Sequence, residues 1–338
     1  MTTRRATADA GSIFKLLELG DYLLPYTIRA VCILGVADHL VEGPLTVAEL
    51  AKRSQTHEAT LRKSLEYLST RDIFTLDGDL VDLTAMADLL RADHPYSARD
   101  IFLSPVACTR AMEGLDHSIR TGEPAFDVVH GISMWKYLAE HPEDGEAFDR
   151  VMSGVTGLEL MAILRSCDWS RFGTIVDVGG GNGSFLASLL RRVKGAQGVL
   201  FDLPGVVSHA PEFLAAAGVD GRARIVAGSF LSDEIPPGGD AYVLKRILYS
   251  WTDEEVVGIL SRVRAAMGPQ SHLFVMEAGR QAEEDPVLAR RMAMLMHTLT
   301  AGGARSLAQQ ENLLNQAGLR LERSISTPMF PIIEAVPA

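Results

Sequence analysis

The sequence has few cysteines, no excess of basic charge and no long apolar run. Cys32, Cys108 and Cys167 are its three cysteines, and such a scattered, odd set is typical of a reducing compartment. Lys and Arg number 32 against 43 Asp and Glu, and the net charge of −11 argues against nucleic-acid or anionic-membrane partners. No stretch of about 18 apolar residues occurs. We therefore expect a cytoplasmic protein without a membrane span.

Metal-binding spacings are also missing. No His-x-x-x-His or Cys-x-x-Cys pair is present, so we predict no metal site. The composition is otherwise that of a globular protein, with 47% apolar and 22% charged residues. A chain of 338 residues is long enough for two domains.

The most informative segment is a glycine-rich turn after a short apolar strand. Residues 174–178 read Thr-Ile-Val-Asp-Val, four glycines follow within five positions, and a helical pattern begins near Leu186. Glycine adopts positive φ without steric cost and lets backbone N–H groups approach a ligand at a helix N-terminus. The segment predicts a nucleotide-binding turn, which dehydrogenases share.

Strands and helices alternate after this turn. A second apolar strand ends on Asp202, where a carboxylate can bind a ribose diol. Further strands are expected over 240–251 and 273–277, and a closing pair over 319–326 and 331–336. This alternation predicts a doubly wound parallel sheet, a Rossmann-like α/β domain, over 166–338.

The region before residue 166 is mainly helical. Residues 1–105 show helices followed by two short strands around Asp77-Gly78, which is a winged-helix pattern, and 106–165 are expected to be bridging helices. A winged helix can bind DNA. The expected second helix carries Glu58 and Glu66 beside Arg62 and Lys63, so it lacks the basic stripe that phosphate contact requires.

In order and spacing, these motifs resemble the small-molecule O-methyltransferases of plant phenolic and bacterial antibiotic pathways, which depend on S-adenosylmethionine. The resemblance spans nearly the whole chain and rests on segments 174–185, 199–204, 228–231, 240–255, 273–277 and 302–306, with 120–126 and 135–142 upstream. It implies a small-molecule aromatic or polyketide substrate. It also implies a homodimer formed through the N-terminal domain, which contributes to the partner's substrate pocket.

Two departures from the family concern its catalytic base. Members usually carry Ile-Leu-His-Asp-Trp, in which the His is the base, whereas this chain has Tyr249 at that position. The family's Gly-Gly-Lys-Glu-Arg supplies a Glu that orients the His, whereas Gly302-Gly-Ala-Arg305 is one residue shorter and has no acid. Of the usual His and two acids, Glu277 is left.

The resemblance and the residues together give the candidate site. The candidate catalytic residues are Glu277, His297 and Tyr249, of which His297 is the better replacement base. The candidate cofactor-binding residues are Asp177, Gly179, Gly181, Gly183, Asp202, Ser229, Phe230 and Lys245. The candidate substrate-binding residues are His130, Trp135, Met152 and Trp251, although side chains of these types are often plain core.

Three functions fit these observations. The first is methyl transfer to an aromatic or polyketide-like secondary metabolite, by proximity and without the usual His base. The second keeps the fold and S-adenosylmethionine but serves hydroxylation, decarboxylation or cyclisation in antibiotic biosynthesis. The third is a winged-helix regulator or a pure binding protein. The substitution at Tyr249 and the missing acid at Ala304 favour the second function without proving it.

Overall fold

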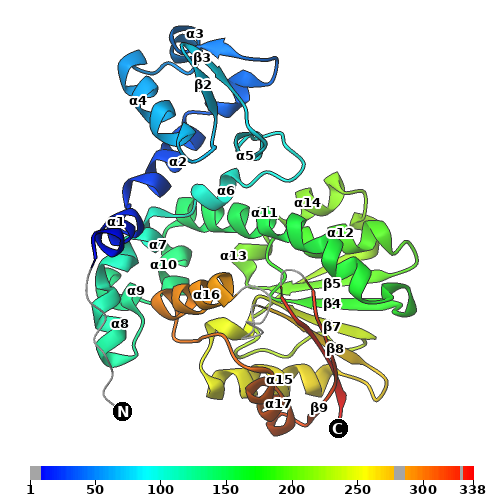
Figure 1. The fold of residues 1–338 in the computed structure, drawn as a ribbon. Coiled ribbons are helices and arrows are strands. Elements are labelled where there is room, and N and C mark those ends of the chain that lie inside the picture. Colours follow the sequence, from blue (N-terminus) through cyan, green and yellow to red (C-terminus); the bar gives the residue numbers. More distant parts are fainter. Residues whose placement is uncertain (1–8, 278–285, 328–329) are drawn as a thin grey trace. The chain divides into compact units, whose positions relative to one another are not determined.

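The computed structural model describes residues 9–277, 286–327 and 330–338 (Figure 1). Within two of its helices the side chains of residues 155–158, 161, 286, 288 and 289 are not described. The chain divides into two compact units, which end at Leu103 and begin at Ser104, so that residues 106–165 belong to the second unit. No helix of the described residues is long and apolar enough to cross a membrane.

The first unit is helical with a small antiparallel sheet of strand order β1-β3-β2. Its elements are α1 (Ala10–Leu19), α2 (Leu23–Ile33), η1 (Ala37–Leu40), β1 (Leu45–Thr46), α3 (Val47–Arg53), α4 (Glu58–Ser69), β2 (Thr75–Asp77), β3 (Leu80–Asp82), α5 (Ala85–Asp88) and α6 (Arg99–Phe102). Thr46 caps α3 by accepting a hydrogen bond from Glu49 N, and Gly78 turns the β2–β3 hairpin at φ +60°. The predicted winged-helix pattern is confirmed.

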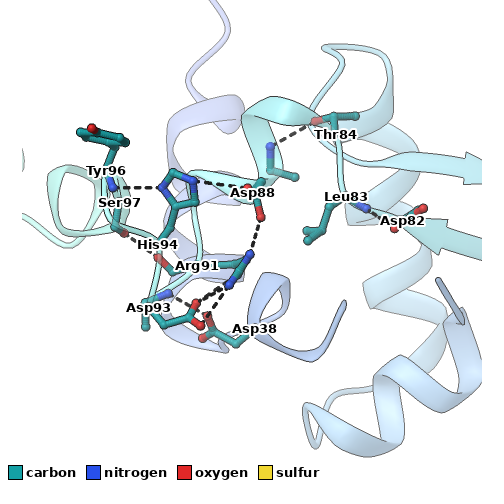
Figure 2. Close-up of polar contacts among 12 residues, drawn as sticks. Asp38, Asp82, Leu83, Thr84, Asp88, Arg91, Asp93, His94, Tyr96 and Ser97 are labelled. Carbon is teal, nitrogen blue, oxygen red and sulfur yellow. Dashed lines mark hydrogen bonds and ion pairs between the residues drawn. The ribbon is translucent and has the colours of Figure 1, made fainter. Parts of the chain in front are cut away.

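The loop between α5 and α6 is held by ionic contacts (Figure 2) in addition to the apolar packing of Leu90. The guanidinium of Arg91 pairs with Asp88 at 2.6 Å and with Asp93 at 2.8 Å. His94 Nε2 lies 3.4 Å from Asp88 Oδ2. Asp38 of η1 accepts hydrogen bonds from Ala92 N and Arg99 Nη1, each at 2.8 Å, and so ties both ends of the loop to one element.

Helices α1 and α2 expose many large apolar side chains. Phe14 and Leu19 of α1 are 71% and 75% exposed, Leu23 of α2 is 64% exposed, and no residue of α1 is buried. Burial of apolar area is the main favourable term in association, so exposed large apolar side chains in this number indicate a protein–protein interface.

The second unit opens with helices and continues into a seven-stranded sheet. The opening elements are α7 (Val106–Arg110), η2 (Ala111–Gly114), α8 (Leu115–Thr121), α9 (Ala125–His130), α10 (Met134–Glu140), α11 (Pro142–Ser166) and η3 (Trp169–Arg171). The sheet strands and the elements between them are β4 (Thr174–Val178), α12 (Ser184–Arg192), β5 (Gln197–Asp202), α13 (Pro204–Val207), α14 (Ala210–Ala216), η4 (Asp220–Arg222), β6 (Ala223–Ala227), β7 (Ala241–Lys245), η5 (Leu248–Ser250), α15 (Asp253–Ala266), β8 (His272–Met276), α16 (Pro286–Leu299), α17 (Leu307–Gln316), β9 (Leu319–Ile325) and β10 (Ile332–Pro337).

The strand order is β6-β5-β4-β7-β8-β10-β9, in which β4 to β8 run parallel and β10 pairs antiparallel with both β8 and β9. Figure 1 shows α12 and α14 on one face of the sheet and α15 and α17 on the other. Alternate strand residues serve the two cores: Ile175 and Val243 pack with α12, whereas Val176 and Tyr242 pack with α15. The predicted doubly wound sheet and its closing strand pair are confirmed.

One predicted strand was too long. The segment 240–251 is a strand only over Ala241–Lys245, because Arg246 adopts φ +59° and leaves the extended conformation. A 3₁₀ turn, η5, follows and carries Tyr249 away from the sheet. The break therefore creates the loop at the carboxyl end of β7, where sheets of this class hold their ligands.

Candidate active site

The glycine turn between β4 and α12 has the expected backbone. Gly179, Gly181 and Gly183 adopt φ values of +72°, +63° and +80°. A Cβ on Gly179 would lie 2.4 Å from Ile247 Cδ1, whereas a Cβ on Gly181 would meet no heavy atom within 4 Å. The turn is thus closely packed at its start and open at Gly181, which is where a ligand can approach the backbone.

Two carboxylates stand at the ends of the adjacent strands β4 and β5. Asp202 Oδ2 accepts a hydrogen bond from Gly181 N at 2.8 Å, and its Oδ1 accepts one from Leu203 N at 2.7 Å. Asp177 is 1% exposed, and its Oδ2 has no hydrogen-bond partner among the described residues. Burial raises the pKa of Asp177 to about 7, against the opposing charge of Lys245.

Lys245 belongs to a buried ionic cluster that the sequence did not predict. Glu159 of α11 is 0% exposed, and its Oε2 lies 2.8 Å from Lys245 Nζ. Its Oε1 accepts a hydrogen bond from Arg246 Nε at 2.9 Å. Burial alone would raise the pKa of Glu159, but the charges of Arg246 and Lys245 outweigh burial and hold it below its ordinary value. No local pattern links α11 to β7, so only the fold reveals this cluster.

Ser229 and Phe230 form the next part of the site. Ser229 N donates to Asp233 Oδ2 at 2.8 Å, and Ser229 Oγ accepts from Leu231 N at 3.2 Å, so the loop after β6 is internally bonded. The Phe230 ring lies 3.2 Å from where a Cβ of Gly179 would be. Phe230 also meets the edge of Trp251, with ring centroids 5.7 Å apart. It therefore connects the glycine turn with the loop after β7.

Tyr249 is part of the loop after β7, and it contacts Glu277, which follows β8. Tyr249 N donates to Glu277 Oε2 at 3.0 Å, and the two residues are 5% and 2% exposed. Burial raises the pKa of the Tyr249 phenol, and the charge of Arg246 only partly opposes this. Burial also raises the pKa of Glu277 to about 7. At neutral pH the Tyr249 side chain is thus a neutral hydroxyl. The Glu277 side chain holds the loop by accepting the hydrogen bond from the backbone N–H of Tyr249.

Arg305 is a second anchor of the same loop. Its guanidinium donates to Leu248 O at 2.9 Å, to Trp251 O at 2.7 Å and to Asp253 Oδ1 at 2.7 Å. Gly302 packs so closely against the loop that a Cβ there would lie 2.1 Å from Tyr249 O. Sequence reasoning noted this segment for its missing acid and did not single out Arg305, although its charge beside the glycine pair was a usable signal.

The candidate acceptor side is aromatic. Trp135 stacks on Trp251 with centroids 6.2 Å apart and planes 15° apart, and Met152 is half-buried on α11. His130 lies in the packing of α9: its Nε2 is 3.0 Å from Ala107 O, and its ring is 4.3 Å from that of Phe126. His297 is half-buried on α16 and makes no side-chain hydrogen bond with a described residue.

The structure thus brings the candidate cofactor-binding residues together around the carboxyl ends of β4, β5 and β7. Of the candidate catalytic residues, it joins Tyr249 to Glu277 and gives no described contact between either and His297. Among the described residues, no group of three or more His, Cys, Asp or Glu side chains could hold a metal ion.

Two family models match this chain. An O-methyltransferase domain matches residues 112–320, and an O-methyltransferase dimerisation domain matches residues 17–93. The chain belongs to the O-methyltransferase family. Mitomycin biosynthesis 6-O-methyltransferase from Streptomyces lavendulae is 37% identical to it over 88% of this chain and 86% of its own length.

Solved structures agree with this assignment. The O-methyltransferase NcsB1 from neocarzinostatin biosynthesis, crystallised with S-adenosylmethionine and 2-hydroxy-5-methyl naphthoic acid, has a TM-score of 0.80 and 34% identity. The match covers 96% of this chain and 98% of that one. A further relative, aclacinomycin 10-hydroxylase RdmB from Streptomyces purpurascens, is 29% identical over 94% of this chain and 87% of its own length.

Membership of the O-methyltransferase family confirms three predictions: the Rossmann-like fold with an N-terminal dimerisation domain, S-adenosylmethionine as the cofactor, and O-methyl transfer as the reaction class. The non-methylating alternative is not favoured, even though one relative is named a hydroxylase. The dimerisation domain also supports the predicted homodimer, and the exposed apolar side chains of α1 and α2 lie partly within it.

Proposed function

We propose that this enzyme methylates an oxygen atom of an aromatic or polyketide-like secondary metabolite, and that this oxygen is already ionised, or easily ionised, at neutral pH. The observation that carries the proposal is Tyr249, a buried phenol of raised pKa at the family's base position. A carboxylate or an acidified phenol needs no base, whereas an ordinary phenol with a pKa near 10 benefits from one.

The cofactor side of the proposal rests on the fit of the glycine turn. S-adenosylmethionine, when bound, supplies an electrophilic methyl group on a sulfonium. We infer that the glycine turn at Gly179, Gly181 and Gly183 receives its methionine and ribose portion, because the space beside Gly181 is open. Asp202 would bind the ribose hydroxyls through charge-assisted hydrogen bonds. The buried and unpaired Asp177 Oδ2 supports a polar ligand at the same turn.

The other cofactor contacts are inferred from neighbouring loops. Ser229 and Phe230 would meet the adenine, since the Phe230 ring lies against the start of the glycine turn. Lys245 would act from the end of β7, where Glu159 fixes its ammonium group. Together these residues orient the methyl donor toward the loop that carries Trp251.

On the acceptor side, we propose Trp135, Met152 and Trp251 as walls that hold a planar acceptor in line with the methyl group. Displacement at a methyl group depends on this alignment, and effective molarities of about 10⁵ M or more are available from positioning alone. His130 would contribute from α9, although its contact with Ala107 O also gives it a packing role.

The roles of the candidate catalytic residues follow from their surroundings. We propose that Glu277 acts by orienting the loop, because its carboxylate accepts from Tyr249 N. Tyr249 would form a polar wall. His297, which has no hydrogen-bond partner among the described residues, is the group that could take a proton from an acceptor that is not yet ionised.

We also infer that the enzyme acts in the cytoplasm. All three cysteines are free and buried, which fits a reducing compartment. Burial raises the pKa of Cys108 to about 12, so its thiol is chemically inert as well as unpaired.

The test is direct. The purified dimer is incubated with S-adenosylmethionine and a panel of aromatic acids, acidic phenols, ordinary phenols and polyketide aglycones, and both S-adenosylhomocysteine and the acceptor mass are followed. We expect S-adenosylhomocysteine together with a gain of one methyl group, and faster turnover of the acidic acceptors. A changed acceptor without consumption of the methyl donor would contradict the proposal.

A further inference from the structure

Trp135 belongs to an aromatic group formed by separate parts of the second unit. Its indole on α10 meets Phe148 of α11 edge to face, with centroids 5.6 Å apart and planes at 90°. On another side it stacks on Trp251, which in turn contacts Phe230. Ring contacts thus connect Trp135, through Trp251, to Phe230, which packs against the glycine turn.

The indole N–H of Trp135 is buried without a partner. No described residue accepts a hydrogen bond from its Nε1, and an indole nitrogen can only donate. The second unit offers a comparison in Trp169, whose Nε1 donates to Ile163 O at 3.1 Å. Buried donors in native proteins are almost always paired, so the unpaired indole N–H of Trp135 indicates that a bound ligand supplies the acceptor atom.

The surroundings of Trp135 fit a planar ligand better than a structural role. Trp169 is a core residue with 2% exposure, whereas Trp135 and Trp251 are only partly buried. A flat conjugated molecule can stack on such rings, and aromatic stacking alone gives no orientation about the ring normal. A single donor directed at one ligand oxygen supplies that orientation.

We propose that the Trp135 indole N–H donates a hydrogen bond to an oxygen atom of the acceptor, distinct from the oxygen that is methylated, and so selects planar acceptors that carry a second oxygen. The partner atom is a ring carbonyl or a carboxylate oxygen. This inference rests on the proposed function, because it deepens the description of the same acceptor site. Trp135 is a specificity-determining residue in this account: its ring remains a wall of the acceptor site, and its N–H selects among planar acceptors.

The test compares two forms of the enzyme on two acceptors. Wild type and Trp135→Phe are each assayed with an acceptor that carries the second oxygen and with its analogue that lacks it. Loss of one hydrogen bond to a buried donor should raise KM about tenfold for the first acceptor, which corresponds to about 1.4 kcal/mol, and leave kcat little changed. For the analogue, Trp135→Phe loses only stacking area, so its KM should rise by a much smaller factor than that of the first acceptor.

Trp169→Phe is the matched control, because it removes an indole N–H that already has a protein partner. It should lower the melting temperature without changing the ratio of the two KM values. A KM that rises equally for both acceptors in Trp135→Phe, or that does not rise, would overturn the proposal.

A second measurement needs no folded variant and no turnover. The indole N–H resonances of the wild-type dimer, bound to S-adenosylhomocysteine, are followed by NMR during titration with each acceptor. We expect the Trp135 signal to move downfield only with the acceptor that carries the second oxygen. Binding without this shift would overturn the proposal. The shift, together with no methylation of that acceptor in the separate assay with S-adenosylmethionine, would contradict the proposed function alone.

Discussion

The two ends of the candidate site are built differently. The cofactor end is centred on residues 177–202, in which the backbone of Gly181 and the carboxylate of Asp202 bond directly to each other. The acceptor end joins distant segments through side chains, as when Arg305 donates to Leu248 O. A site made from a local backbone turn tolerates few substitutions. A site assembled from distant side chains can lose its catalytic base, as at Tyr249, while the loop that carried the base keeps its conformation.

The largest expected effect concerns the anchor of the acceptor end. Arg305→Ala leaves the carbonyls of Leu248 and Trp251 without their buried donor, and should lower the free energy of unfolding by about 4 kcal/mol. Because the glycine turn makes none of these contacts, the Kd of S-adenosylmethionine should change little. Urea denaturation and calorimetric titration measure the two quantities.

Arg323→Ala provides the matched control for this prediction. Arg323 also pairs with a carboxylate, that of Glu334 at 2.6 Å, but half of the Arg323 side chain is exposed, whereas the Arg305 side chain is buried. The control should cost much less stability than Arg305→Ala, since exposed ion pairs contribute little. Equal losses of unfolding free energy in the two variants would mean that Arg305 does not stabilise the loop more than Arg323 stabilises its own contacts.

The second prediction uses the pKa of Glu277, which burial raises from 4.5 to about 7. The folded state therefore binds this proton more tightly than the unfolded chain, so the stability that the group contributes falls as pH rises from about 4.5 to about 7. Glu277→Gln removes this dependence. Relative to wild type, the variant should gain about 3 kcal/mol of unfolding free energy between pH 4.5 and pH 8.

Urea denaturation of both proteins at pH 5 and pH 8 measures the effect. Asp177, whose pKa burial also raises to about 7, is present in both proteins and cancels in their difference. Glu311→Gln, at an exposed position on α17, is the control for the substitution itself. A wild-type-to-Glu277→Gln difference that is constant with pH would contradict the account.

The third prediction addresses the cofactor end. Asp202→Asn removes the charge that we assign to the ribose hydroxyls and should weaken S-adenosylmethionine binding about tenfold to a hundredfold. Acceptor binding in the presence of a saturating cofactor concentration should stay the same. The exposed Asp220→Asn serves as control. Isothermal titration calorimetry measures the Kd of S-adenosylmethionine. The assignment would be contradicted if both variants bound the cofactor as tightly as wild type.

The comparison of the two ends also explains what the sequence could predict. The glycine turn and the alternating strands are local patterns, and the structure has both. The ionic cluster of Glu159 with Lys245 and Arg246 was missed, because its members approach only after folding. The strand predicted over 240–251 failed for a similar reason: the positive φ of Arg246 breaks it, and no glycine marks the break.

The smallest expected effect is at the substituted base position. Tyr249→Phe removes a hydroxyl to which we assign no proton transfer, so kcat/KM for an ionised acceptor should change by less than about threefold. Steady-state kinetics on one aromatic acid is sufficient. A loss of more than about a hundredfold would assign catalysis to the phenol after all.

The central claim, methyl transfer to an oxygen that is ionised before it reacts, is tested most directly by the pH dependence of kcat/KM on two acceptors whose hydroxyl groups differ in pKa. We predict that the inflection of each profile follows the pKa of its own acceptor and is the same in His297→Ala as in wild type. An inflection shared by both acceptors and abolished in His297→Ala would instead show that the enzyme uses a histidine base.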